Sequence, residues 1–317
     1  MGRRVIGVDV GGTKTKAQLF EDETAIATRT IPTVPGPDGV VTTCTSAIES
    51  LLDGTSTGDV VAVGVGLPGE VDPASGTVRH AVNLGFDATP YPISKVLERR
   101  IGVPVTVEND VRAATVGVYQ WLRADRPVDS AVYLAIGTGI SAGFVDRGRL
   151  VRGHRGMAGE IGHVIVDERG PRCRCGAQGC LEAVLGGWAL GAAWQEGAPP
   201  EALFTAADQG DPEAVALADR AGRYLAQAIQ WLLAGFDPQQ IVIGGGLIQN
   251  CPGLLQRAHL HLRRWSGSSQ LHHASLDLSR ISALPPGLAP GAWGAAFLAD
   301  RERSADCTTD DTEGEQP

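Results

Sequence analysis

The sequence predicts an α/β protein with two lobes, each carrying a mixed sheet of the same design. The main observation is that one pattern occurs twice, at residues 4–20 and again at 132–145: an apolar strand, a glycine turn and a second apolar strand. Strand-like and helix-like stretches alternate between and after these segments, which is typical of α/β folds. The chain has 317 residues, enough for two domains with a substantial core.

The remaining elements follow from the spacing of apolar residues and from the turn residues that bound them. In the first half we expect a helix at 38–53, a strand at 60–67 turned by Pro68 and Gly69, a helix at 93–101, a strand at 103–107 and a helix at 110–121. In the second half we expect a long amphipathic helix at 212–234, a strand at 241–243 ending in three glycines, and an alanine-rich closing helix at 291–301.

These elements suggest a division into lobes. We expect a small N-terminal lobe at 1–115, completed by the closing helix at 291–302. A larger lobe at 116–290 would carry a metal-binding loop and a dimer surface. Residues 303–317 are rich in acidic residues and are expected to form a disordered tail.

Composition excludes several classes of function. The formal net charge is -9, which argues against nucleic acid as the main partner. No apolar run reaches membrane-spanning length, and the start of the chain lacks the long apolar stretch of a signal peptide. We therefore expect a cytoplasmic protein with no membrane partner.

The first candidate site is the run Asp-Val-Gly-Gly-Thr-Lys, from Asp9 to Lys14. A polyphosphate needs backbone N–H groups at close range, and side chains at Gly11 and Gly12 would block that approach. The hydroxyl group of Thr13 can donate a hydrogen bond. A strand-end carboxylate such as Asp9 can hold Mg²⁺ directly or through water. The run therefore predicts a phosphate loop rather than a plain glycine hairpin.

Two further glycine turns are candidates for binding a nucleotide. The turn at 137–139 has the same place in the second strand pair, so we expect it to cradle the γ-phosphate. The turn at 244–246 could let adenine or ribose lie flat against the backbone, although it could equally be a helix entry. The expected nucleotide contacts in these turns are Gly137, Thr138, Gly139 and Gly245.

The triplet Glu108-Asn109-Asp110 ends a predicted strand. A hydroxyl is a poor nucleophile unless a base takes its proton, and a strand-end carboxylate near a phosphate site suits that role. Asn109 offers both a donor and an acceptor, which suits a sugar hydroxyl. The alternative is that Asn109 and Asp110 only cap the following helix.

A cluster of cysteines predicts a metal site. His163 is followed by Cys173, Cys175 and Cys180, and one imidazole with three thiolates forms a closed tetrahedral zinc set. A closed set leaves no position for water, so the zinc would be structural. The alternative is three core or free cysteines.

Taken in this order, the Asp-x-Gly-Gly-Thr-Lys run, the Glu-Asn-Asp triplet, and the Glu-x-Gly-His run with its cysteines resemble the ROK family (repressors, open reading frames and sugar kinases), over about residues 4–302. The resemblance implies an actin-like, hexokinase-type fold with a central cleft between two lobes. It also implies ATP and Mg²⁺, a structural Zn²⁺ and, as relatives are often dimers, a homodimer.

The resemblance also assigns roles by position. Asp110 would be the catalytic base, and Glu182 would meet the hydroxyl at the anomeric end of the sugar. The sugar ligands it implies are Gly69, Asn83, Asn109, Asp110, Glu160, His163 and Glu182. The ATP contacts it implies are Gly11, Gly12, Thr13, Lys14, Thr138, Gly139 and Gly245. The sequence departs at Arg112, where relatives often carry a small or amide residue, and at Ser141-Ala142, where a glycine is often seen.

The function expected from the resemblance is ATP-dependent phosphorylation of a hexose, with glucose as the first choice because this ligand set has a partner for every hydroxyl. Kinases of N-acetylmannosamine, N-acetylglucosamine, fructose and allose share the set and stay open. A sugar-responsive regulator of the same family would carry a helix-turn-helix ahead of the phosphate loop, for which residues before Asp9 leave no room. A non-catalytic sugar binder is the other alternative.

Overall fold

The computed structural model describes residues 3–52, 60–195 and 197–310. It divides into two compact units. The first contains the chain up to Pro127, the segment Arg152–Met157 and the chain from Ala289 onward; the second contains Val128–Val151 and Ala158–Leu288.

The sheet of the first unit has five strands in the order β3-β2-β1-β4-β7. Their bounds are β1 Arg4–Val10, β2 Lys14–Glu21, β3 Thr24–Pro32, β4 Val60–Leu67 and β7 Val105–Asn109. Strands β1, β2 and β3 form an antiparallel meander, whereas β4 and β7 run parallel to β1. The carboxyl ends of β1, β4 and β7 therefore meet at one edge of the sheet.

Helices cover both faces of this sheet. The first unit also contains α1 Pro37–Leu51, β5 Glu70–Asp72, β6 Thr77–Arg79, η2 Val82–Leu84, α2 Ile93–Ile101, α3 Asp110–Asp125 and α11 Pro290–Asp310. Alternate residues of β1 face opposite sides, as the pleat requires: Ile6 and Val8 pack in the core with α1 and α2, while Val5 packs with Ala296 of α11.

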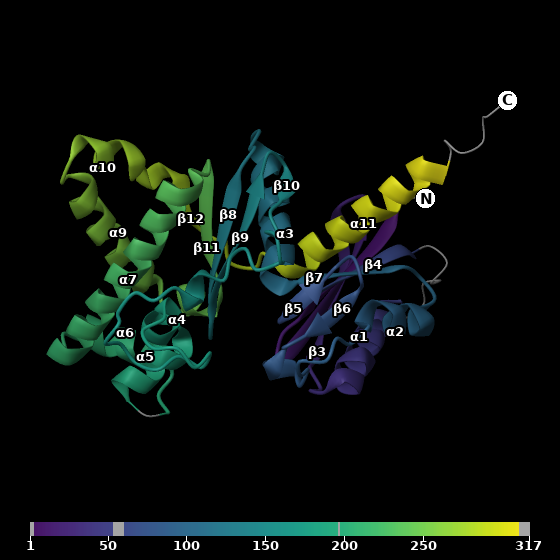
Figure 1. Ribbon diagram of the computed structural model, residues 1–317, viewed down its shortest axis with the longest axis horizontal. Helices are drawn as coiled ribbons and strands as arrows, with labels where there is room; N and C mark the ends of the chain where they lie inside the picture. Colours follow the sequence, from purple (N-terminus) through teal and green to yellow (C-terminus); the bar gives the residue numbers. More distant parts are fainter. Residues whose placement is uncertain (1–2, 53–59, 196, 311–317) are drawn as a thin grey trace. The chain divides into compact units, whose positions relative to one another are not determined.

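Helix α11 lies directly on the backbone of the sheet (Figure 1). A Cβ atom added to Gly7 of β1 would come 1.8 Å from the carbonyl oxygen of Ala292. One added to Gly64 of β4 would come 1.8 Å from that of Ala295. These strand glycines are therefore explained by the close approach of the helix, not by a ligand.

The second unit repeats the same sheet, in the order β10-β9-β8-β11-β12. Strands β8 and β9 are antiparallel, and β11 runs parallel to both β8 and β12. Its strands are β8 Ala131–Ile136, β9 Ile140–Asp146, β10 Arg149–Leu150, β11 Gln240–Gly244 and β12 Ile281–Ala283. Its helices are η3 Ile161–His163, α4 Leu181–Leu185, α5 Gly187–Trp194, α6 Pro200–Asp208, α7 Pro212–Phe236, α8 Gly246–Asn250, α9 Pro252–Ser266, α10 Gln270–Ser275 and η4 Leu278–Arg280.

The predicted duplication of the mixed-sheet motif is confirmed, and each element predicted from the sequence is present to within a few residues, apart from the longer ends of α3 and α11. The unit boundary falls at Pro127, not after residue 115, because α3 continues to Asp125 and packs on α11. Helix α11 continues to Asp310, into the predicted tail; residues 311–317 lie outside those described. The sequence analysis missed β3, the β5–β6 hairpin and helices α5, α6 and α9.

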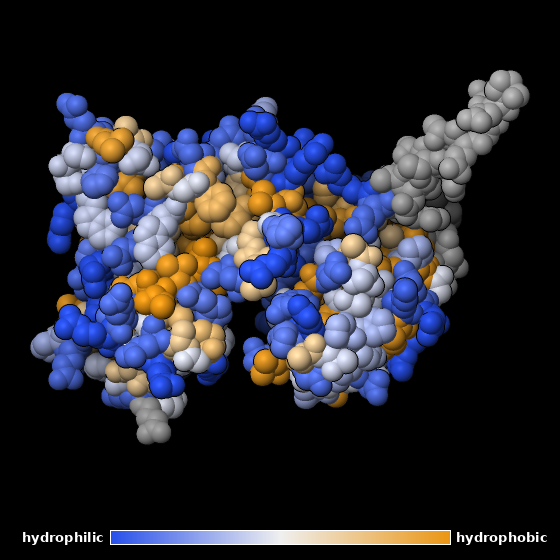
Figure 2. All heavy atoms as spheres, viewed as in Figure 1, coloured by the Kyte–Doolittle hydropathy of each residue, from blue (hydrophilic) through white to orange (hydrophobic). Residues whose placement is uncertain are grey.

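In the described part of the chain, no helix is both long and apolar enough to cross a membrane. Figure 2 shows hydrophilic side chains over most of the face that it presents, with apolar side chains in smaller groups between them.

The contact between α11 and the sheet can be tested at Gly64. We expect Gly64→Ala to lower the free energy of unfolding by ~1–3 kcal/mol or more, because the methyl group has no room beside Ala295. The matched control is Gly235→Ala in α7, where nothing lies within 4 Å of the added Cβ. There the same change should stabilise the helix by ~0.5–1 kcal/mol. Equal effects of the two changes in chemical denaturation would contradict this packing.

Candidate functional site

Two carboxylates lie at the carboxyl edge of the first sheet. Asp9 is near the end of β1, and Asp110 is the first residue of α3, directly after β7. Strand β4 separates them, but its residue opposite Asp9 is Gly66, which has no side chain. A Cβ atom added to Gly66 would come 3.6 Å from the Cα atom of Asp110. It would come closer still, 3.2 Å, to the Cβ atom of Ala113, so the glycine lets the start of α3, which carries Asp110, pack closely on β4.

The electrostatics of Asp9 confirm this proximity. Burial, and then the negative charge of Asp110, raise the pKa of Asp9 from 3.8 to about 6, and Lys16 and Lys14 oppose the shift. The carboxylate also packs against Gly291, at the start of α11. A partly buried acid beside a second acid is a natural position for a divalent cation, which would relieve the repulsion.

The predicted phosphate loop is a tight turn between β1 and β2. The N–H of Gly11 donates to the carbonyl of Lys14 at 3.0 Å. Thr33, just after β3, fixes the turn from the side: its hydroxyl donates to the carbonyl of Gly11 at 2.8 Å and its N–H to that of Thr13 at 3.0 Å. The sequence analysis missed Thr33, since only the pairing of β3 brings it here.

Asn83 lies beside this turn. It is the middle residue of η2, and its side chain is exposed. A Cβ atom added to Gly12 would come 3.4 Å from the Cβ atom of Asn83. The first unit therefore brings the predicted sugar ligand Asn83 next to the predicted phosphate loop.

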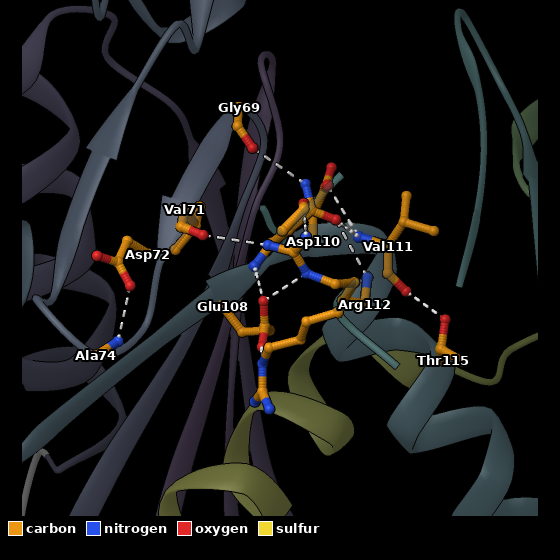
Figure 3. Close-up of polar contacts among 12 residues, drawn as sticks. Gly69, Val71, Asp72, Ala74, Glu108, Asp110, Val111, Arg112 and Thr115 are labelled. Atoms are coloured by element: carbon orange, nitrogen blue, oxygen red, sulfur yellow. Dashed lines mark hydrogen bonds and ion pairs between the residues drawn. The ribbon is translucent and has the colours of Figure 1, made fainter. Parts of the chain in front are cut away.

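The triplet at the end of β7 serves as a helix cap and also positions Asp110. The side-chain oxygen of Asn109 accepts from the N–H groups of Val111 and Arg112, at 3.1 and 3.2 Å. Its amide nitrogen donates to the carbonyl of Gly69 at 3.4 Å. Asp110 accepts from the N–H of Val111 at 2.9 Å (Figure 3). The capping alternative is thus true of Asn109, and the cap fixes the first turn that carries Asp110.

The backbone conformation and the close packing at position 69 require a glycine. Its φ of +100° is in the region that favours glycine, and an added Cβ would come 2.8 Å from the Cβ atom of Ala81. The turn after β4 is therefore held against the strand end by Asn109 and against the hairpin by close packing.

In the second unit, Glu182 lies against the turn at 137–139. One of its carboxylate oxygens accepts from the N–H of Ile140 at 3.1 Å, and a Cβ atom added to Gly139 would come 2.7 Å from that oxygen. The turn is also fixed by Gly187, whose N–H donates to the carbonyl of Gly137 at 2.9 Å.

A pocket with a volume of ≈ 330 Å³ opens beside this turn. Its lining residues are Gly137, Thr138, Gly187, Trp188, Gly191, Ala198, Pro200, Glu201, Gly246 and Leu247. Gly245, with φ +97°, packs its backbone on the end of β8, where an added Cβ would come 2.4 Å from the carbonyl oxygen of Ile136. The sequence analysis missed Trp188; the pair Gly186-Gly187 before it was the available signal.

The cysteine cluster has the dimensions of a metal site. The ligand atoms of His163, Cys173, Cys175 and Cys180 all lie within 4.8 Å of one another. The sulfur atoms of Cys175 and Cys180 are 3.7 Å apart, too far for a disulfide and close to the ~3.8 Å edge of a tetrahedron with 2.3 Å Zn–S bonds.

The surroundings of Cys180 favour a cation at this place. Burial, and then the hydrogen bonds of Cys175 and Cys173, raise the pKa of Cys180 to about 12. A thiolate here is therefore unfavourable unless a positive charge accompanies it. The donor set, its spacing and its electrostatics all fit Zn²⁺.

The segment that carries Glu160 ends at this cluster. Glu160 is exposed and immediately precedes η3, whose last residue is His163. The preceding carbonyl, of Gly159, accepts from the N–H of Ala142 at 2.9 Å and from the hydroxyl of Ser141 at 3.2 Å. The cysteine cluster and strand β9 thus lie at the two ends of the short segment that presents Glu160.

Each unit therefore collects its own set of predicted residues. The first brings together Asp9, Gly11, Gly12, Thr13, Lys14, Gly69, Asn83, Asn109 and Asp110. The second brings together Gly137, Thr138, Gly139, Gly245 and Glu182 and, around the cysteines, Glu160 and His163.

This chain is similar in sequence to a known protein family and to characterised sugar kinases. The family model described as "ROK family" matches residues 5–302. The glucokinase of Thermotoga maritima is 35% identical over 265 residues, covering 77% of this chain and 82% of that protein. The N-acetylmannosamine kinase of Shigella flexneri is 33% identical over 246 residues, covering 77% and 83%.

Solved structures agree. The ROK hexokinase from Thermus thermophilus matches with a TM-score of 0.79 and 32% identity, covering 95% of this chain and 99% of that one. The ROK family glucokinase from Streptomyces griseus, solved in complex with glucose and AMPPNP, matches with a TM-score of 0.77 and 31% identity, covering 94% and 99%. The expected actin-like, hexokinase-type fold is thereby confirmed.

The pKa of Asp9 predicts a pH-dependent stability. Because this pKa is raised on folding, Asp9 contributes stability that is full below pH 3.8 and lost as the pH rises through about 6. We expect Asp9→Asn to raise the free energy of unfolding of the nucleotide-free protein by ~1–3 kcal/mol at pH 7.5, and by about half as much at pH 5. Denaturant unfolding at both pH values measures this.

The control for this prediction is Asp146→Asn, at an exposed position at the end of β9. It should change stability little at either pH. A destabilising Asp9→Asn at pH 7.5 would contradict a pKa of Asp9 raised by burial and by the charge of Asp110.

Proposed function

Because the chain belongs to the ROK family, we propose that it is a hexose kinase, which transfers the γ-phosphoryl group of ATP to glucose and forms glucose 6-phosphate. The observation that carries the proposal is the pair Asp9 and Asp110 at the edge of the first sheet, beside the glycine turn at 11–14. A cation-binding acid, a phosphate-binding turn and a second acid are the groups that phosphoryl transfer to an alcohol requires.

In the proposed reaction, Asp110 takes the proton of the sugar's primary hydroxyl. The hydroxyl oxygen forms a bond to the γ-phosphorus as the bond from that phosphorus to the β,γ-bridging oxygen breaks, and ADP leaves with the electron pair. The N–H groups of Gly12 and Thr13 would donate to phosphate oxygens. Mg²⁺ accompanying ATP would neutralise charge on the phosphates, with Asp9 as its protein ligand.

The nucleotide would enter the pocket of the second unit. The turn at 137–139 would receive the phosphates, and the pocket beside it has room for the nucleoside. The buried indole N–H of Trp188, which lines this pocket, has no hydrogen-bond acceptor among the described residues. Use of ATP as the donor fits action in the cytoplasm.

For the sugar, we propose Asn83, Asn109, Glu160, His163 and Glu182 as hydroxyl ligands and the turn at Gly69 as a contact surface. Asn109 would contribute through its amide nitrogen, because its oxygen caps α3. Glucose is the preferred substrate, in line with the named activity of the Thermotoga relative. The Shigella relative favours N-acetylmannosamine as the alternative.

We further propose that the cysteine cluster holds a structural Zn²⁺ and that the protein is a homodimer. Zinc would fix the direction of η3 and hence of Glu160. Large apolar side chains are exposed on the second unit, including Phe236 of α7 at 54% and Leu271 of α10 at 76%, which suits burial against a second copy.

The central test is turnover with a panel of hexoses and ATP, followed as ADP release. The parent should phosphorylate glucose or N-acetylmannosamine, and Asp110→Asn should lower kcat by ~10²–10⁴-fold, because the base is lost, while sugar binding measured by calorimetry is largely kept. The control is Asp125→Asn, at an exposed position at the other end of α3, which should retain full activity. A parent that binds sugar without turnover would instead support the regulator or sugar-binder alternative.

Metal analysis tests the zinc proposal. Freshly purified protein should hold about one zinc per chain, since four ligands close one tetrahedral site. Cys175→Ser should lose this zinc, whereas Cys44→Ala, at a buried cysteine of α1 outside the cluster, should retain it. A parent without zinc would refute the metal assignment.

A further inference from the structure

Arg112 is a buried charged residue that the proposed reaction does not use. It lies in the first turn of α3, two residues after Asp110, and its side chain is only 6% exposed. Burying a guanidinium is costly unless its N–H groups are hydrogen-bonded and its charge is balanced. The contacts of Arg112 must therefore offset this cost.

These contacts reach three separate parts of the first unit. The Nε atom donates to a carboxylate oxygen of Glu108 at 2.6 Å. One terminal nitrogen donates to the carbonyl of Val71 in β5 at 3.2 Å, and the other donates to the carbonyl of Gly156. Figure 3 shows the guanidinium of Arg112 between Glu108 and Val71. One side chain thus joins the end of β7, the β5–β6 hairpin and the segment Arg152–Met157.

Glu108 is the centre of this arrangement. It is 1% exposed, and the carboxylate oxygen that faces Arg112 also accepts from the N–H of Asn109 at 2.9 Å. Its other oxygen accepts from the Nε atom of Arg152 at 2.6 Å. One buried carboxylate is therefore held between two arginines, and its partners lie directly before Asp110 and in the segment Arg152–Met157.

We infer that Arg112 is a positioning residue for phosphoryl transfer, an inference that rests on the proposed function. Through Glu108 it fixes the strand end from which Asp110 projects. The same carboxylate accepts from the N–H of the proposed sugar ligand Asn109. Through Gly156, Arg112 also holds the segment Arg152–Met157 within the same unit. Each of its three nitrogen atoms donates to a protein group and its side chain is 6% exposed, so Arg112 acts through these partners.

The first test is the kinetics of Arg112→Met. We expect kcat to fall by ~10–100-fold, because the base and the sugar ligand are displaced slightly, and the KM for sugar to rise. The KM for ATP should stay close to that of the parent, since Arg112 holds none of the proposed nucleotide contacts. The matched control is Arg79→Met, which removes a 50% exposed arginine paired with Glu70 and should change neither constant.

A merely structural role would lower stability and the active fraction, and so lower kcat with both KM values unchanged; that result would overturn the inference. Should Arg112→Met not fold, Arg112→Lys decides the question. Lysine keeps the charge, but its single ammonium cannot span acceptors on three segments. We expect this variant to fold and still to show a raised sugar KM, and parental values for it would overturn the inference.

The parent's turnover is measured first, on the sugar panel. A parent without turnover on any sugar removes the proposed function, and this inference with it. An active parent whose two Arg112 variants keep its kcat and sugar KM removes this inference alone.

Discussion

The structure depends on the approach of two like charges, those of Asp9 and Asp110, at one edge of a parallel arrangement of strands. The register of β1, β4 and β7 brings the two acids to the same edge, and Gly66 lets the start of α3 pack closely on β4. Burial, and then this approach, disfavour the charged form of Asp9 and raise its pKa. The rest of the first unit must therefore keep in place a site that gains favourable interactions only when a cation and phosphate arrive.

Two side chains bind the backbone on either side of the connection at Met157–Ala158 between the two units. Arg112 donates to the carbonyl of Gly156, and Ser141 donates to the carbonyl of Gly159. The segment between these carbonyls leads directly to Glu160. These hydrogen bonds therefore restrict the backbone on each side of the connection, and the bond from Ser141 does so next to a proposed sugar ligand.

The sequence was a good guide where a local pattern carries the information. Apolar spacing located α2, β4 and α7, and the order of the glycine turns predicted the duplicated sheets. It was a poor guide where pairing over long distances decides the outcome. Thr33 reaches the phosphate loop only through the pairing of β3 with β2, and the three acceptors of Arg112 come together only in the folded unit. Neither arrangement leaves a periodic pattern or a characteristic spacing of residues in the sequence.

In the triplet at 108–110, the sequence alone did not separate the role of a helix cap from that of a catalytic residue. A helix that follows a parallel strand must begin at the carboxyl edge of the sheet, so its cap lies where ligands bind in such sheets. Asn109 therefore caps α3, and in doing so it turns Asp110 toward the same edge as Asp9. The carboxylate of Glu108 faces inward, to two arginines, and stabilises the same turn from below. One local sequence thus supplies the cap, the proposed base and the buried support for both.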